Sequence, residues 1–77
     1  MREPTAVTLR IDVGGAVTVL AFTWQGRTLR VASPGRAWQA DDGHHRMVMT
    51  PDSRVFELLQ TPEGGWFVVG ASGRRVV

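Results

Sequence analysis

The side chains that could coordinate a metal ion gather in one stretch, Asp41-Asp42-Gly43-His44-His45. Carboxylate oxygens and imidazole nitrogens are common ligands of divalent cations. Neighbouring residues of a strand point to opposite faces, so His44 and His45 cannot both bind one ion from a regular strand. The chain has no cysteine and no further histidine to complete a site. We therefore expect an acidic turn that leads into a strand, with no metal and no cofactor.

The candidate nucleophiles form no catalytic pattern. Ser33, Ser53 and Ser72 each lie beside Pro, Asp or Gly, where serine commonly makes the hydrogen bonds of a turn. The sequence has no G-x-S-x-G elbow, no phosphate-binding P-loop and no dinucleotide fingerprint. A chain of 77 residues also has little room for a pocket of the usual volume. We predict that the protein is not an enzyme.

Arginine supplies all nine basic residues, and its guanidinium suits phosphate, carboxylate and aromatic rings. High genomic GC content, which favours arginine codons, is the alternative explanation for this choice. Seven acidic residues leave a net charge of +2, so only a one-sided distribution of arginine would give a face that binds nucleic acid. The candidate contacts to a partner or to nucleic acid are Arg10, Arg27, Arg30, Arg36, Trp38 and Arg46.

Residues 17–31 predict the central β-hairpin, with its turn at Gln25-Gly26. The flanks are rich in β-branched and aromatic residues, and glycine supplies the positive φ that a two-residue turn needs. This register places the bulky side chains on one face, which is the predicted core. The expected pairs are Trp24 with Arg27, Phe22 with Leu29, and Leu20 with Val31.

Residues 7–13 alternate apolar and polar side chains and predict a half-buried strand. Gly14-Gly15 then turns the chain into the next strand, which two hairpins therefore share. A two-residue turn again leaves the bulky residues of that strand on the buried face. The expected pairs are Val13 with Ala16, Ile11 with Thr18, Leu9 with Leu20, and Val7 with Phe22.

The second half of the chain predicts a long loop and three more strands. Pro34-Gly35 and Asp41-Asp42-Gly43 interrupt residues 33–43, which predicts a loop whose Trp38 either covers the core edge or is an exposed contact. Phe56 and Leu58 are the expected inward residues of the middle strand. The predicted strands are residues 44–50, 54–59 and 66–70, with turns at residues 50–53 and 61–65.

Short strands at about ten-residue spacing, without helical periodicity, predict one all-β domain over residues 1–77. We expect residues 1–4 and 71–77 to fray. A small, antiparallel, partly open barrel or strongly bent sheet of about five to six strands, SH3-like, would bury the apolar faces and protect the edges. No stretch resembles a secretion signal or a membrane span. We expect a cytoplasmic protein without membrane contact.

A pattern of aromatic, glycine and arginine residues spans residues 17–69 and consists of Phe22, Trp24, Gly26, Arg27, Arg30, Val31, Trp38, Arg46, Phe56, Glu57, Leu58, Gly65, Trp66 and Phe67. It resembles a family of small uncharacterised actinobacterial proteins with a F-x-W-x-G-R-x-Y-x-V hairpin, a Trp-rich loop, a F-E-L strand and a W-F strand. Their genes often lie beside translesion-polymerase and mutagenesis genes, so the resemblance implies a role near DNA repair. The chain departs from the pattern at Leu29, where an aromatic is usual, and after Trp38, where a paired Trp is missing.

Two classes of function remain open. The first is a non-catalytic interaction module that docks on a larger protein partner, or on a second copy of itself, through strand edges, arginine and Trp38. The second is a nucleic-acid-binding accessory domain linked to DNA repair or translesion synthesis, in which Trp24, Trp38 or Trp66 stacks on bases. Neither class uses a small-molecule substrate. We favour the first, because nearly balanced charge gives little general attraction for DNA.

Overall fold

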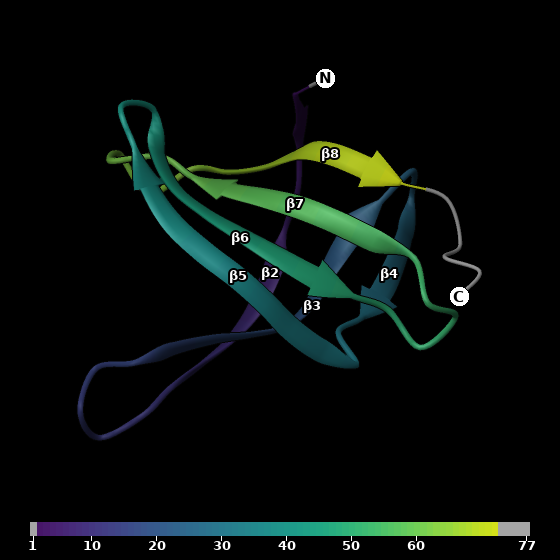
Figure 1. The fold of residues 1–77 in the computed structure, drawn as a ribbon, viewed down its shortest axis with the longest axis horizontal. Helices are drawn as coiled ribbons and strands as arrows, with labels where there is room; N and C mark the ends of the chain where they lie inside the picture. Colours follow the sequence, from purple (N-terminus) through teal and green to yellow (C-terminus); the bar gives the residue numbers. More distant parts are fainter. Residues whose placement is uncertain (1, 73–77) are drawn as a thin grey trace.

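The computed structural model describes residues 2–72, which form eight β-strands and no helix (Figure 1). No segment of this described part is therefore a helix that could cross a membrane. A five-stranded antiparallel sheet has the order β1-β8-β7-β6-β5, and a three-stranded sheet has the order β2-β3-β4. The strands are β1 (Glu3–Pro4), β2 (Val7–Ile11), β3 (Val17–Trp24), β4 (Arg27–Arg30), β5 (Ser33–Ala40), β6 (Gly43–Met49), β7 (Val55–Gln60) and β8 (Trp66–Ser72).

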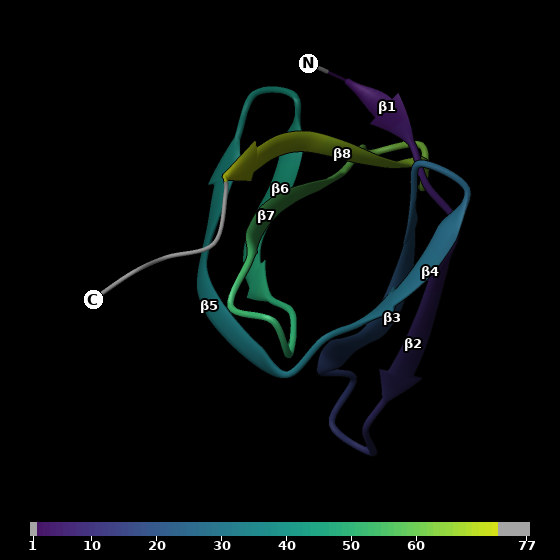
Figure 2. The same ribbon diagram turned by 90° about the vertical axis from the view of Figure 1, so that its right-hand side faces the viewer.

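The chain joins the two sheets at two corners, where β1 continues into β2 and β4 into β5. At the first corner the Thr5 N–H donates to the Trp66 carbonyl at 3.0 Å, and the Thr5 hydroxyl donates to the Thr23 carbonyl at 2.7 Å. At the second the Ala32 N–H donates to the Met49 carbonyl at 2.7 Å. The sheets face each other without closing completely (Figure 2). The expectation of a small, partly open, antiparallel β fold is confirmed.

The core lies between the inner faces of the two sheets. Phe56 is at its centre, with its ring edge-to-face with Phe22 at 5.0 Å and with Trp24 at 5.5 Å between centroids. Such pairs add to the stability that apolar burial provides. The predicted inward residues Phe56 and Leu58 are both fully buried. The buried cluster consists of Val19, Phe22, Trp24, Val48, Phe56, Leu58 and Val68.

The central hairpin of β3 and β4 has the predicted turn. Gln25 and Gly26 have φ of +49° and +76°, as a two-residue type I′ turn requires. Trp24 lies opposite Arg27 and Phe22 opposite Leu29. The Val31 N–H donates to the Leu20 carbonyl at 2.9 Å, which continues the same register.

The prediction that Leu20 is buried is wrong, since 40% of it is exposed and Val19 takes the core position. The loop after β2 has three residues and not two: the Asp12 N–H donates to the Ala16 carbonyl at 2.9 Å, and Gly15 has φ +87°. This extra residue shifts the pairing by one. A bulge that leaves Leu20 without a partner on β2 then restores the predicted pair of Val7 with Phe22. The pairs between these two points are Ile11 with Val17, Arg10 with Thr18, and Leu9 with Val19.

The turn between β2 and β3 projects away from the five-stranded sheet (Figure 1). Ile11 is 66% exposed and Val13 is fully exposed. The prediction that both lie in the half-buried part of the strand is therefore wrong, because the facing sheet does not reach them.

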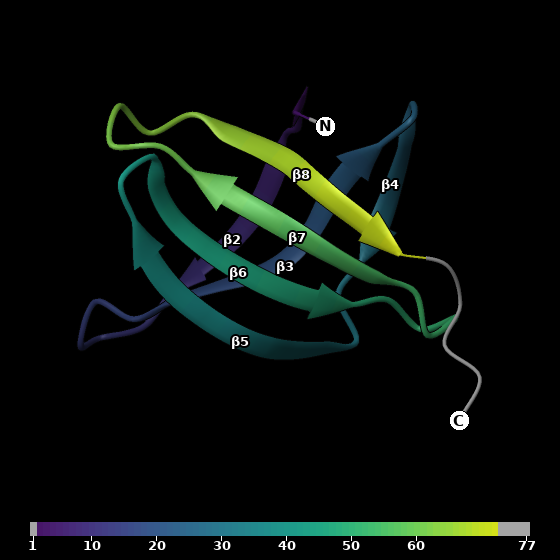
Figure 3. The same ribbon diagram turned by 45° about the horizontal axis from the view of Figure 1, so that its top comes forward.

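The segment predicted as a long loop is the edge strand β5, paired with β6 (Figure 3). An edge strand tolerates Pro34, because its missing N–H can face away from the neighbouring strand. The register shifts between Pro34 and Ala37, a β-bulge that absorbs Gly35 and Arg36. Trp38 lies opposite His45 within the sheet. It is neither a lid nor a loop residue.

The ends of the described segment are also more ordered than predicted. Glu3 and Pro4 pair with Val68 and Phe67 of β8, and β8 extends through Ser72. The expectation of fraying is wrong for these residues, and residues 73–77 lie outside the described part.

Candidate functional site

The predicted arginine contacts do not gather on one surface. Arg10 is exposed on β2 and pairs with Asp12 at 3.4 Å between Nε and Oδ1. Arg27 and Arg30 are exposed on β4. Arg36 lies on β5, in the other sheet. In the described part of the chain these four arginines therefore provide scattered positive charge and no continuous basic groove.

Arg36 and Trp38 do come together, on the outer face of the five-stranded sheet. The Arg36 guanidinium carbon lies 5.2 Å from the centroid of the Trp38 ring. The indole also stacks on the imidazole of His45, with 5.2 Å between centroids and 9° between planes. Trp38 is half-buried in this stack. The predicted contact residue is therefore already engaged on the protein's own surface.

His45 is held between two carboxylates. Its Nδ1 lies 2.7 Å from an oxygen of Glu57 and its Nε2 lies 2.7 Å from an oxygen of Asp42. The hydrogen bond to Asp42 raises the pKa of His45, and that to Glu57 acts in the same direction against burial. The same bond lowers the pKa of Asp42. An imidazolium can donate to both carboxylates at once, which a neutral imidazole cannot.

This cluster leaves no imidazole nitrogen for a metal ion, because both nitrogens of His45 are engaged. The adjacent His44 points to the other face of β6, where its Nδ1 lies 3.0 Å from the amide oxygen of Gln39. Within residues 2–72, no group of three or more potential ligands has an arrangement that could hold a metal.

Arg46 lies on the inner face of β6, between the two sheets. Its Nη1 donates to the Gln60 amide oxygen at 3.1 Å, and its guanidinium carbon lies 5.0 Å from the centroid of the Trp66 ring. Burial lowers the pKa of Arg46, but a guanidinium stays charged at neutral pH. In the described part of the chain no carboxylate forms an ion pair with it. Among the residues that the structure describes, Arg46 is thus a partly desolvated cation without a paired carboxylate.

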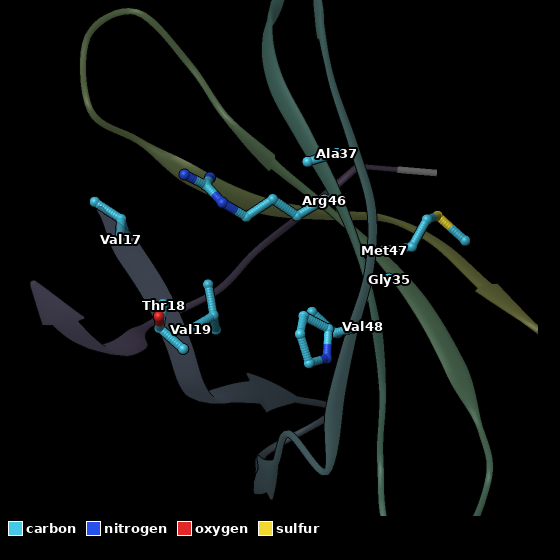
Figure 4. A pocket seen from close by; sticks show the side chains of 9 residues that line it. Val17, Thr18, Val19, Gly35, Ala37, Arg46, Met47 and Val48 are labelled. Atoms are coloured by element: carbon cyan, nitrogen blue, oxygen red, sulfur yellow. The ribbon is translucent and has the colours of Figure 1, made fainter. Parts of the chain in front are cut away.

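The sheets separate where β4 ends. β4 pairs with Ala21–Trp24 of β3, so in the described structure residues 17–19 pair with β2 alone. Within residues 2–72, β5 is the last strand of its own sheet and also has one unpaired edge. A cavity of about 260 Å³ lies between these two elements, and Arg46 reaches across it towards Val17 (Figure 4). We call it the β3–β5 opening, and its lining consists of Val17, Thr18, Val19, Pro34, Gly35, Ala37, Arg46, Met47 and Val48.

The projecting hairpin extends the apolar lining of this opening. Ile11 pairs with Val17, and paired residues of neighbouring strands share one face of a sheet. Val17 lines the opening, while Ile11 is largely exposed beyond it. Apolar surface therefore continues from the β3–β5 opening onto the hairpin.

Of the residues predicted as contacts, only Arg46 lies in the β3–β5 opening. The other lining residues were not predicted, although the alternation of Val17 and Val19 with Thr18 could have identified an apolar face. The sequence does not reveal that β4 pairs with only part of β3.

Comparison of the chain with protein-family models, with curated proteins and with solved structures gives no match. The function must therefore be inferred from the geometry of the His45 cluster and of the β3–β5 opening.

Proposed function

We propose that this protein is a cytoplasmic, non-catalytic interaction module that binds a partner protein at the β3–β5 opening. The observation that carries the proposal is that β3 and β5 each have an edge without a partner strand among the described residues, with an apolar cavity between the two strands. Unpaired strand edges are templates for another strand. Pro34 and the bulge that follows it limit such pairing at the start of β5, whereas residues 17–19 of β3 contain no proline. Here the exposed Ile11 and Val13 add apolar surface beside the opening.

The dimensions favour a protein partner over a metabolite. About 260 Å³ lies below the roughly 300 to 1,000 Å³ of typical small-molecule pockets. A cavity of this size can accept single side chains of a larger ligand. The hydrogen-bonded His45 cluster lies on the outer face of the sheet, so it adds no acid or base to this opening.

Nucleic-acid binding, as an accessory domain in DNA repair or translesion synthesis, is the rival function. It would require arginines that act together, whereas Arg30 and Arg36 lie on different sheets and Arg46 lies between them. The indole of Trp38 also has little free surface on which a base could stack, since His45 covers one side of it. These placements support a protein partner.

Site-specific photo-crosslinking in the native host tests the proposal. A photoreactive benzoylphenylalanine replaces Ile11 beside the opening, and a matched variant carries it in place of Thr28 on β4, which is also exposed. We expect a discrete protein adduct at position 11 and none at position 28. Equal labelling at both positions, adducts to nucleic acid, or no adduct would each overturn the proposal.

A further inference from the structure

We infer that the β3–β5 opening binds an extended segment of the partner that carries an acidic side chain among apolar ones. This inference rests on the function proposed above and specifies the chemistry of the ligand. It combines the backbone of the opening, the side chains that line it and the charge of Arg46.

The backbone of the opening favours an added strand. In the described structure, residues 17–19 lack a partner on the edge opposite β2, β5 lacks one on the edge opposite β6, and residues of both elements line the opening. A segment entering there would bring N–H and C=O groups to both elements, and main-chain pairing of this kind provides much of the affinity in strand addition. It would also connect the two sheets at the point where they now separate.

The lining favours apolar side chains at alternate positions of that segment. Val17, Val19 and Val48 face the cavity from both sheets. Every second side chain of an inserted strand points to the same face, so the residues that face inwards would remove this valine surface from water.

Arg46 determines the charge of the ligand. It is the one charged residue that lines the opening within residues 2–72, and no carboxylate there pairs with it. An Asp or Glu side chain could form charge-assisted, bidentate hydrogen bonds with the guanidinium. A nucleic acid would bring many phosphates to this single arginine and would place them against valine, which makes it the poorer match.

Peptide selection on the full-length protein tests the inference. The probe is a phage-displayed library of random seven-residue segments, and we expect enriched sequences to alternate apolar residues around one Asp or Glu. The best binder is then synthesised with its acid and with the matching amide, and both affinities are measured by fluorescence anisotropy. The acidic peptide should bind at least 10-fold more tightly, by analogy with other hydrogen-bonded charge pairs.

Two variants connect this difference to Arg46. Arg46→Gln should bind both peptides equally, while Arg30→Gln, on the exposed face of β4, should retain the 10-fold preference. The comparison of the two peptides on the unmodified protein remains valid even if Arg46→Gln fails to fold. Recovery of no binder, equal affinity for both peptides, or competition by a single-stranded oligonucleotide would overturn the inference. Crosslinking at position 11 to a protein whose contact segment is not acidic would overturn it too, while leaving the interaction function in place.

Discussion

The indole of Trp38 lies flat on the imidazole of His45, with 5.2 Å between centroids and 9° between planes, while Asp42 and Glu57 hold both imidazole nitrogens. The stack fixes the edge strand β5 to β6 on the outer face of the larger sheet. It also connects the stability of this sheet to the protonation of one histidine.

The pH dependence of stability follows from the direction in which folding shifts the pKa of His45. The pKa of His45 is higher in the folded protein than its ordinary value of 6.5, so its contribution is complete below pH 6.5 and is lost as the pH rises through the folded pKa. Urea unfolding at a series of pH values should show a free energy of unfolding that falls on the alkaline side, and His45→Gln should remove this fall.

His44 provides the matched control, because its pKa is lowered, mainly by burial. Its contribution has the opposite sign: it is present above pH 6.5 and is lost as the pH falls through the folded pKa. His44→Gln should therefore remove a loss of stability below pH 6.5 and leave the alkaline decrease in place. The same slope in both variants would contradict the assigned role of His45.

Phe22 and Leu20 should differ sharply in their contributions to stability. Phe22→Ala removes a ring that is 1% exposed and packs on Phe56, and should cost about 3 to 5 kcal/mol. Leu20→Ala affects an exposed residue and should cost less than about 1 kcal/mol. Chemical denaturation of both variants measures the difference, and equal losses would contradict the bulge that separates the two side chains.

Among the glycines of residues 2–72, Gly43 should be the least tolerant of a side chain. Its φ is +139°, and an added Cβ would clash with the carbonyl oxygen of Gln60 on the neighbouring strand. Gly43→Ala should destabilise the protein by at least about 3 kcal/mol. Gly64→Ala is the control, since φ there is +90° but the space is open, and backbone strain alone costs about 1 to 2 kcal/mol. Thermal unfolding measures the melting temperature of both variants. Equal melting temperatures would contradict the clash at Gly43.

Ile11, one of the two exposed apolar residues near the tip of the projecting hairpin, should serve binding and contribute little to stability. Ile11→Ser changes a side chain that is 66% exposed, so the free energy of unfolding should change by less than about 0.5 kcal/mol. Affinity for the selected acidic peptide should nevertheless fall. Leu9 packs against the core, so Leu9→Ser provides the comparison. If Ile11→Ser lowered the free energy of unfolding as much as Leu9→Ser does, Ile11 would be structural.

The parts of the fold that the sequence predicts are those that local chemistry decides. Gln25-Gly26 forms its turn because glycine permits the required φ, and the alternation around Phe22 identifies the buried face. Leu20 could not be placed, because Gly14-Gly15 is compatible with a loop of two or of three residues and nothing local marks the bulge. Trp38 was assigned to a loop because Pro34 disrupts most strands, whereas its tolerance depends on β5 lying at an edge.

The position of the candidate site was still harder to predict, because it depends on contacts between residues far apart in the sequence. Arg46 could be named as a candidate, but its position between the sheets follows from pairing with Leu58 on β7. The β3–β5 opening exists because β4 ends at Arg30 while β3 begins at Val17. Such a difference in strand length is visible only once the strands are paired.

Residue-level amide hydrogen exchange, with and without the selected acidic peptide, tests strand addition most directly. We predict slower exchange at residues 17–19 and along β5, because the added strand would accept hydrogen bonds from their unpaired N–H groups, and no change in Arg27–Arg30. Binding that leaves residues 17–19 and β5 unprotected, or that protects Arg27–Arg30 in their place, would contradict the account.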